Sequence, residues 1–169
     1  MAESRHHQIL AALQARFEGI VSDQGVTYWY APDRVVRVTV YDRLLADPSV
    51  GDVVYALRAG EERHSEESTG DGTNGGYVAA EAEVWALLLR RTASADENPY
   101  GSDGTTKADE QDRIVRDFLR ALWLDVTLGG LCNNIVSGSL VVDRDVDVEG
   151  WACAEARFTV LYSYPARTP

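Results

Sequence analysis

Residues 122–131, LWLDVTLGGL, mark the point where the sequence changes from a helical pattern to a strand pattern. Before this stretch, Ile114, Phe118 and Leu122 recur at every fourth position, as residues on the buried side of an amphipathic helix do. Its glycine pair permits backbone angles that other residues rarely adopt, which indicates a tight turn. The stretch therefore predicts a helix that is joined through a glycine turn to the sheet on which it packs.

Periodicity elsewhere predicts the remaining elements. A first helix is expected over 4–21, and the second over 106–124, with Thr106 as its N-cap. Strand patterns cover residues 26–30, 34–41, 53–57, 77–92, 135–143 and 150–164. In the last strand every second residue is small or apolar, and this face is expected to lie under the helices. Together these elements predict an α+β fold, a mostly antiparallel mixed sheet with two amphipathic helices packed on one face.

Two polar stretches interrupt this pattern, at about 58–76 and 93–106. The first is rich in Gly, Ser, Thr and Glu, so its burial cannot offset the entropy of ordering it. Both are expected to be long mobile loops inserted between elements. Since the chain has 169 residues, we expect a single domain over 1–169.

Composition limits the classes of partner. The formal net charge is −11, so DNA phosphates should repel the chain, and a sequence-specific nucleic-acid reader is disfavoured. No apolar stretch approaches the ~20 residues of a membrane span, and the first residues do not form a secretion signal. A cytoplasmic protein is therefore expected. Cys132 and Cys153 are interpreted as buried, reduced thiols, although a disulfide is possible if the fold brings them together.

Two motifs have a chemical precedent. Residues 70–75, GDGTNG, match the spacing of a dinucleotide-binding loop, but they lack the preceding strand and following helix that this site needs. Asp143, Asp145 and Asp147 alternate as in the first half of a calcium loop. The sixth and twelfth positions are Val148 and Ala154 instead of Gly and Glu, so these aspartates are interpreted as the exposed side of a hairpin. Whether they bind a cation stays open.

No catalytic constellation is apparent. His6 and His7 lie near the chain start and His64 lies in the first polar loop, without a metal-ligand spacing or an adjacent structured Ser or Cys. Glu81 and Glu83 share a strand face, where carboxylates are usually solvated or paired with arginine. We therefore expect no catalytic residue, no metal ligand and no cofactor.

The helix-exit turn and the closing strand carry a family resemblance. The residues concerned are Asp125, Thr127, Leu128, Gly129, Gly130, Phe158, Tyr162 and Pro165. In these positions the chain resembles the tail terminator, or tail completion, proteins of long-tailed bacteriophages, the lambda-like tail terminator family. The resemblance covers mainly 114–165, with weaker agreement in the opening helix, while the two polar loops depart from the shortest members.

The resemblance implies a structural protein of the virion, located at the head-proximal end of the tail and assembled in the host cytoplasm. Family members form a hexameric ring that ends polymerisation of the tail-tube protein. The ring provides the surface for the head-tail connector or neck proteins, and genomic DNA passes through its lumen without specific binding. Neither an enzyme activity nor a membrane is implied.

Other functions are compatible with the residues. One alternative is a head-closure or neck protein, or a tail-tube subunit, and the last of these would polymerise into tubes. A further alternative is a small ligand-binding α+β domain or enzyme, whose mark would be a deep pocket with convergent polar groups.

Overall fold

The computed structural model describes residues 4–165 except for 48, 66–76, 93–105 and 147. The elements in chain order are α1 (Arg5–Glu18), β1 (Arg34–Arg37), α2 (Asp42–Leu45), β2 (Val53–Ser65), β3 (Tyr77–Arg91), α3 (Lys107–Trp123), β4 (Asn134–Asp143) and β5 (Trp151–Pro165). They form a five-stranded sheet in the order β1-β2-β3-β5-β4. Only β1 and β2 are parallel; the other neighbouring pairs are antiparallel.

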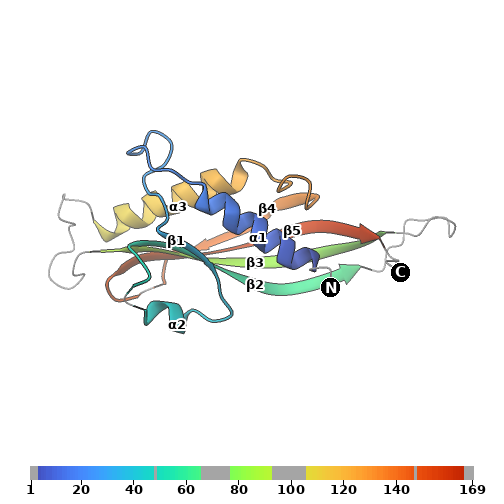
Figure 1. Ribbon diagram of the computed structural model, residues 1–169, viewed down its shortest axis with the longest axis horizontal. Coiled ribbons are helices and arrows are strands. Elements are labelled where there is room, and N and C mark those ends of the chain that lie inside the picture. The colour runs from blue at the N-terminus through green and yellow to red at the C-terminus, as the bar shows by residue number, and fades with distance from the viewer. Residues whose placement is uncertain (1–3, 48, 66–76, 93–105, 147, 166–169) are drawn as a thin grey trace.

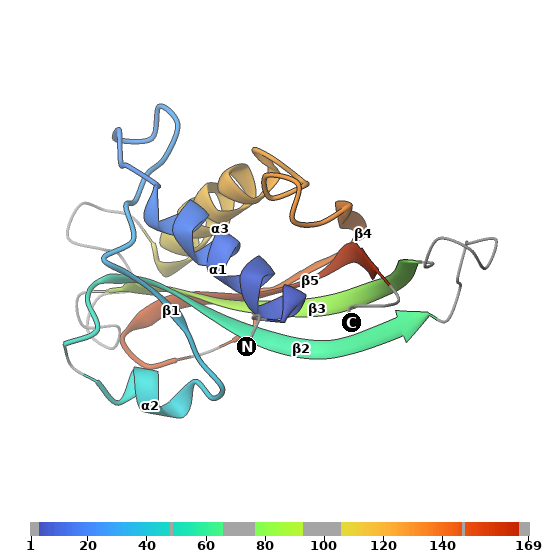
Figure 2. The same ribbon diagram turned by 45° about the vertical axis from the view of Figure 1, so that its right-hand side comes forward.

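The two long helices, α1 and α3, cover the same face of the sheet, and the short α2 lies on the opposite side (Figure 1). The predicted α+β architecture, a mostly antiparallel mixed sheet with two amphipathic helices on one face, is confirmed. Figure 2 shows that β2, β3 and β5 continue beyond the N-terminal end of α1. We call the part of the sheet that runs from the aligned residues Arg58, Trp85, Arg157 and Val141 towards this end the distal half. The end covered by β1 and α2 is the proximal half.

The core between helices and sheet combines bulky and small side chains. Phe17 of α1 stacks on Phe118 of α3 at a centroid distance of 5.0 Å. Tyr55 of β2 meets both rings edge-on, at 5.6 and 6.1 Å, and Phe158 of β5 lies 6.2 Å from Phe118. Such aromatic pairs add about 0.5–1.5 kcal/mol each beyond the burial of area. The strands contribute buried alanines opposite these rings, namely Ala80, Ala82, Ala86, Ala154 and Ala156.

Both long helices begin at a side-chain cap. The Ser4 hydroxyl accepts a hydrogen bond from the His7 backbone N–H at 3.2 Å. Thr106 and Asp109 form a reciprocal capping box, in which each side chain accepts a hydrogen bond from the other residue's backbone N–H. The predicted helices are thus confirmed, with Thr106 as the cap of α3, although α1 ends at Glu18 and not at residue 21.

The first polar stretch is in part a strand, and the prediction of a loop beginning at 58 is wrong. β2 extends to Ser65, and its residues from Glu62 onward pair with β3. The physical reason is that the hydrogen bonds between strands join main-chain atoms. Polar side chains therefore do not prevent the pairing when β2 and β3 are in register. The rest of this stretch, 66–76, lies outside the described residues, as does 93–105 of the second predicted loop.

Two further expectations about strands need correction. Residues 26–30 form no strand, because their backbone N–H groups bond to the carboxylates of Asp23 and Asp117 instead of a ladder. The strand expected over 34–41 stops at Arg37. The last main-chain bond on this side, from Val38 N–H to the Leu57 carbonyl, precedes the crossing of the chain to α2 on the other face.

A second apolar cluster lies under α2, on the face opposite the long helices. Its buried members are Leu44, Val50, Val54, Ala56, Leu87, Leu89, Trp151 and Cys153. Cys132 belongs instead to the core on the helix side. Both cysteines are buried, and they form no disulfide with each other, since the sheet separates them. The predicted burial of both thiols is confirmed.

A buried carboxylate fixes the segment between α1 and β1 on α3. Asp117 has no solvent exposure, and it accepts hydrogen bonds from the backbone N–H groups of Trp29 and Tyr30 at 2.8–3.0 Å. Burial raises the pKa of Asp117 above its ordinary value, while these two N–H groups counteract the rise. Arg113 stacks on the Trp29 ring at 4.4 Å and holds the same segment from outside.

Replacing Asp117 with Ala should release this segment and lower the free energy of unfolding by about 2–4 kcal/mol, because two buried N–H groups lose a charged acceptor. Asp117→Asn keeps the shape of the side chain and one carbonyl oxygen, so its free energy of unfolding should fall by less. Urea unfolding, with hydrogen exchange at the Trp29 and Tyr30 amides, measures both effects. Equal stability of the two variants and the parent would contradict the assigned role.

Candidate functional site

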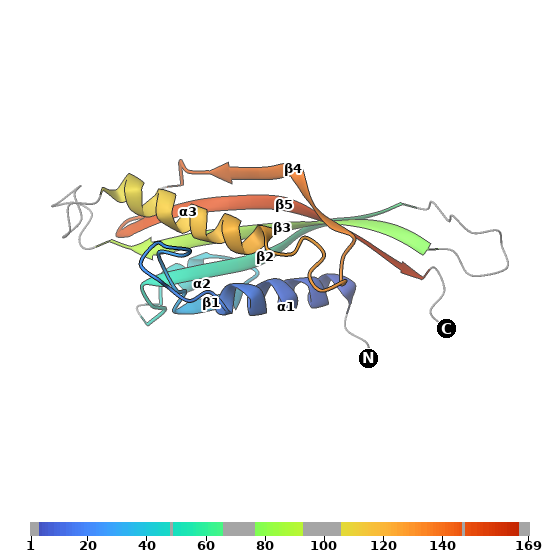
Figure 3. The same cartoon turned by 90° about the horizontal axis from the view of Figure 1, so that it is seen from above.

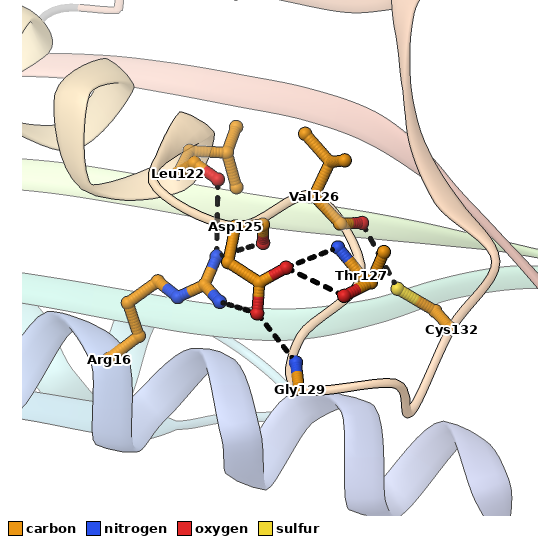
Figure 4. A network of polar contacts seen from close by, with 7 residues as sticks. All are labelled: Arg16, Leu122, Asp125, Val126, Thr127, Gly129 and Cys132. Atoms are coloured by element: carbon orange, nitrogen blue, oxygen red, sulfur yellow. Dashed lines mark hydrogen bonds and ion pairs between the residues drawn. The ribbon is translucent and has the colours of Figure 1, made fainter.

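The helix-exit turn is held by one aspartate (Figure 4). The Asp125 carboxylate accepts hydrogen bonds from the Thr127 backbone N–H at 2.9 Å, the Thr127 hydroxyl at 2.6 Å and the Gly129 N–H at 2.6 Å. Arg16 of α1 reaches the same place: it donates to the carbonyls of Leu122 and Asp125 and lies 3.4 Å from the carboxylate. The turn therefore connects α1 to the end of α3.

These contacts favour the ionised form of Asp125. Hydrogen bonds from the Thr127 hydroxyl and from the N–H groups of Thr127 and Gly129, with the Arg16 guanidinium, lower the pKa of Asp125 from 3.8 to about 2. In contrast, burial raises the pKa of the nearby Cys132 thiol to about 11, and this thiol donates to the Val126 carbonyl. The thiol is thus a packed side chain, not a reactive one.

Three successive residues of the turn adopt left-handed backbone angles. The φ values are +52° at Leu128, +69° at Gly129 and +85° at Gly130. Leu128 tolerates this conformation because its side chain is buried in the core. A Cβ at either glycine would meet no atom within 4 Å, so the requirement for glycine comes from the backbone angle and not from space.

The closing strand carries the other predicted residues. Phe158 and Tyr162 are 1% exposed and share the helix-side core with Leu128. Pro165 is the last residue of β5 and pairs with Tyr77 of β3. The Asn133 N–H bonds to the Leu161 carbonyl at 2.7 Å, which brings the chain from the turn directly into the β4–β5 ladder. The structure therefore unites α3, the turn, β4 and β5 in one continuous unit.

The open face of the sheet, opposite the long helices, was not predicted as a site. On it the Trp85 ring has the guanidinium of Arg58 at 4.4 Å and that of Arg157 at 5.0 Å. The Trp85 Nε1–H donates to the Glu83 carboxylate at 2.7 Å, and a Cβ at Gly60 would lie 2.6 Å from that carboxylate. Arginine and tryptophan are the residue types enriched at protein interfaces.

The distal half of the sheet has two free strand edges. β1 pairs only with Val54–Leu57, so the outer side of Arg58–Ser65 has no strand partner within the described residues. At the other end of the strand order β4 is the last strand, and no further strand pairs with it within the described residues. In Figure 3 β4 runs along one side of the sheet, and the twist of the sheet carries the far end of β2 across β3 and β5. Exposed edges of this kind can pair with another chain.

Sequence reasoning also missed a polar cluster at the distal strands. His6 of α1 is 8% exposed, and its Nδ1 lies 3.7 Å from the Glu62 carboxylate. The other Glu62 oxygen is 3.8 Å from His64 Nε2, and His64 Nδ1 is 3.3 Å from the Tyr164 hydroxyl. The sequence signal was the alternation of Glu62 and His64, which places both on the helix side of a strand.

A hollow of about 440 Å³ lies beside this cluster. Its lining residues are Arg63, His64, Ala79, Ala80, Glu81, Asn133, Leu161 and Tyr162. Side chains alternate between the faces of a strand. By the registers, Arg63 and Glu81 therefore belong to the open face, and His64 and Tyr162 to the helix side. The polar groups thus do not converge on one point, as those of a ligand site would.

The remaining candidate motifs gain no support as binding sites. The GDGTNG segment at 70–75 and Asp147 lie outside the described residues. Asp143 and Asp145 are exposed, and the Asp143 carboxylate accepts the Asp145 N–H at 2.9 Å. In the described ranges no three His, Cys, Asp or Glu side chains are arranged to hold a metal ion. Glu81 is exposed and Glu83 is bonded to Trp85.

Comparison with known proteins gave no family for this chain. No family model matches the sequence. No curated protein matches it either. Among the described helices, none has both the length and the apolar character needed to cross a bilayer.

Replacing Gly129 or Gly130 with Val should destabilise the protein by about 1–2 kcal/mol or more, because a β-branched residue is strained at a left-handed backbone angle. Gly138→Val is the matched control, since Gly138 lies on β4, has no positive φ and has open space around its Cβ. Thermal unfolding and the yield of soluble protein measure the effect. Normal folding and assembly of both turn variants would exclude a structural role for the glycine pair.

Asp125→Asn should change the dependence of stability on pH. A carboxylate whose pKa is lowered by folding stabilises the fold above its unfolded pKa of about 4, and this contribution disappears as the pH falls through about 2. The variant should therefore be less stable than the parent at pH 7, and the difference should close towards pH 2. Urea unfolding at several pH values tests this, with the exposed Glu149→Gln as control. A difference that is constant with pH would refute the assignment.

Proposed function

We propose that this chain is a structural protein of a long-tailed bacteriophage virion, a tail terminator that closes the tail tube as a hexameric ring. The observation that carries the proposal is the unit of α3, turn, β4 and β5, because the residues behind the family resemblance lie together in it. Asp125 organises the turn, and Phe158 and Tyr162 anchor the closing strand in the core under α3.

The geometry of the sheet supports an assembling subunit. A ring needs contacts between two different surfaces of each copy. The distal half offers such a pair in the free edges of β2 and β4. An enzymatic function has less support. The polar groups around the 440 Å³ hollow belong to two faces of the sheet and so do not converge on one substrate position.

In this role the ring would end polymerisation of the tail-tube protein and bind the head-tail connector or neck proteins. It would be assembled in the host cytoplasm and remain in the virion at the head-proximal end of the tail. The net charge of −11 supports passage of genomic DNA without specific binding, because an acidic protein adheres weakly to phosphates. We assign no cofactor and no catalytic residue to this function.

The mass in solution distinguishes this function from its alternatives. Light scattering over a concentration series, with negative-stain images of the same sample, should give closed rings of six subunits. Long tubes would favour a tail-tube subunit instead, and rings of another copy number a head-closure or neck protein. A monomer at every concentration would count against the proposal and favour the small ligand-binding domain.

A further inference from the structure

The two free edges of the distal half lie at the same level along the strands. Through successive cross-strand partners, Arg58 of β2 is aligned with Trp85, Arg157 and finally Val141 of β4. Five residues further along β2, Arg63 is aligned in the same way, through Glu81 and Leu161, with Asn134 of β4. The free part of β2 and the edge strand β4 therefore span the same rows of the sheet.

We infer that the free edge Arg58–Ser65 of β2 pairs, as an antiparallel ladder, with residues 134–141 on the edge of β4 in a second copy of this chain. The inference deepens the proposed function, on which it rests, by naming the contact between neighbouring subunits of the ring. It concerns main-chain atoms that have no strand partner in the described part of a single copy.

The directions of the strands fit this pairing. β2 is antiparallel to β3, β3 to β5, and β5 to β4, so β4 runs opposite to β2 within one copy. A second copy that is related by rotation about an axis along the strands keeps this relation. Its β4 therefore meets β2 in the antiparallel arrangement, which is the more stable ladder.

The aligned rows bear on closure. A contact between two different surfaces gives a ring if the rotation carries no shift along its axis, and an open helix if it does. Arg58 and Val141 share one row, and Arg63 and Asn134 another, so the two edges present segments that cover the same rows of the sheet. This arrangement is compatible with a closed ring.

The end of β1 limits the register of the ladder. β1 occupies the edge of β2 as far as the Arg37–Leu57 pair, so the neighbour's strand can extend only up to this point. Val142 and Asp143 would fall in the rows of Leu57 and Ala56, where β1 is already paired. The ladder therefore ends at the row of Arg58 and Val141.

Both edges also carry an irregularity that restricts uncontrolled pairing. The β2 register shifts between Ala59 and Glu62, and the β4 register shifts between Val136 and Val141. On β4 the Ser139 hydroxyl accepts the Thr159 N–H and replaces a ladder bond. Bulges of this kind interrupt an edge and disfavour random aggregation. Regular pairing between the two edges is therefore restricted to the residues on either side of these irregularities.

Disulfide trapping tests the pairing in the full-length protein. Arg63 and Asn134 are exposed and lie in the same row, so the double variant Arg63→Cys, Asn134→Cys should form disulfides between neighbouring copies. Within one copy the two positions are three strand spacings apart, about 14 Å, which is too far for a disulfide. Mild oxidation should give a ladder of covalent species that ends at the hexamer on a non-reducing gel.

In the matched control, Arg63→Cys, Glu149→Cys, the second cysteine stands between β4 and β5 instead of at the start of β4. This variant should give no series of cross-linked species on the gel. Rings without cross-links in Arg63→Cys, Asn134→Cys would overturn the inference but leave the terminator function intact. A cross-linked dimer alone would also overturn it, because it indicates a two-fold contact. If the parent forms no ring, the proposed function fails as well, which light scattering shows independently.

A second variant tests the same edge without cysteine. The Leu57 carbonyl points away from β3, since it accepts the Val38 N–H, and by alternation along the strand the N–H of the exposed Ala59 points the same way. Ala59→Pro therefore removes an N–H that the ladder with β3 does not need. We expect a folded monomer by circular dichroism and light scattering, with Ala59→Ser still forming rings. Normal rings of a folded Ala59→Pro variant would refute the pairing.

Discussion

The packing of aromatic rings from two helices against an alanine-lined sheet is the constraint on which the rest of the structure depends. Phe17 and Phe118 share the helix-side core with buried strand alanines such as Ala82 and Ala156, whose methyl side chains leave space for rings between the layers. A larger residue at either alanine would push a helix away from the sheet. The same contact fixes the end of α3, and hence the position of the turn at Asp125.

The helices leave the distal strands partly uncovered, and the two faces of the sheet consequently differ in character. On the helix side, the apolar core ends at a cluster of histidine, glutamate and tyrosine around Glu62. On the open face, the second apolar cluster under α2 is followed by stacked arginines on Trp85 and then by carboxylates. This gradient from apolar to charged along the strands suits a subunit whose proximal half is a stable body and whose distal half meets other chains.

Much of the fold follows from periodicity. The stripe through Ile114, Phe118 and Leu122, and the alternation along β3 and β5, predict the two layers because burial determines both patterns. The capping pair Thr106 and Asp109 can be predicted from the sequence because the two residues are only three positions apart. The extension of β2 was not predictable in this way, since its polar residues are held by pairing with β3 and not by burial.

The candidate site was predictable to a different degree. Asp125 and the glycine pair are visible in the sequence, because a turn is encoded by neighbouring residues. The partners that give the turn its tertiary role are not, since Arg16 lies 109 positions away. The stacking of Arg58 and Arg157 on Trp85 likewise brings together three strands, and no pattern within one strand predicts it.

An edge strand recognises its neighbour through atoms that every residue possesses. In the proposed ring, substitutions along the edges of β2 and β4 could therefore accumulate without loss of pairing, provided that proline is avoided and the bulges keep their places. Selection would then act on the length and position of the strands more than on the identity of their side chains. Sequences under such a constraint would stay similar mainly at turns and glycines.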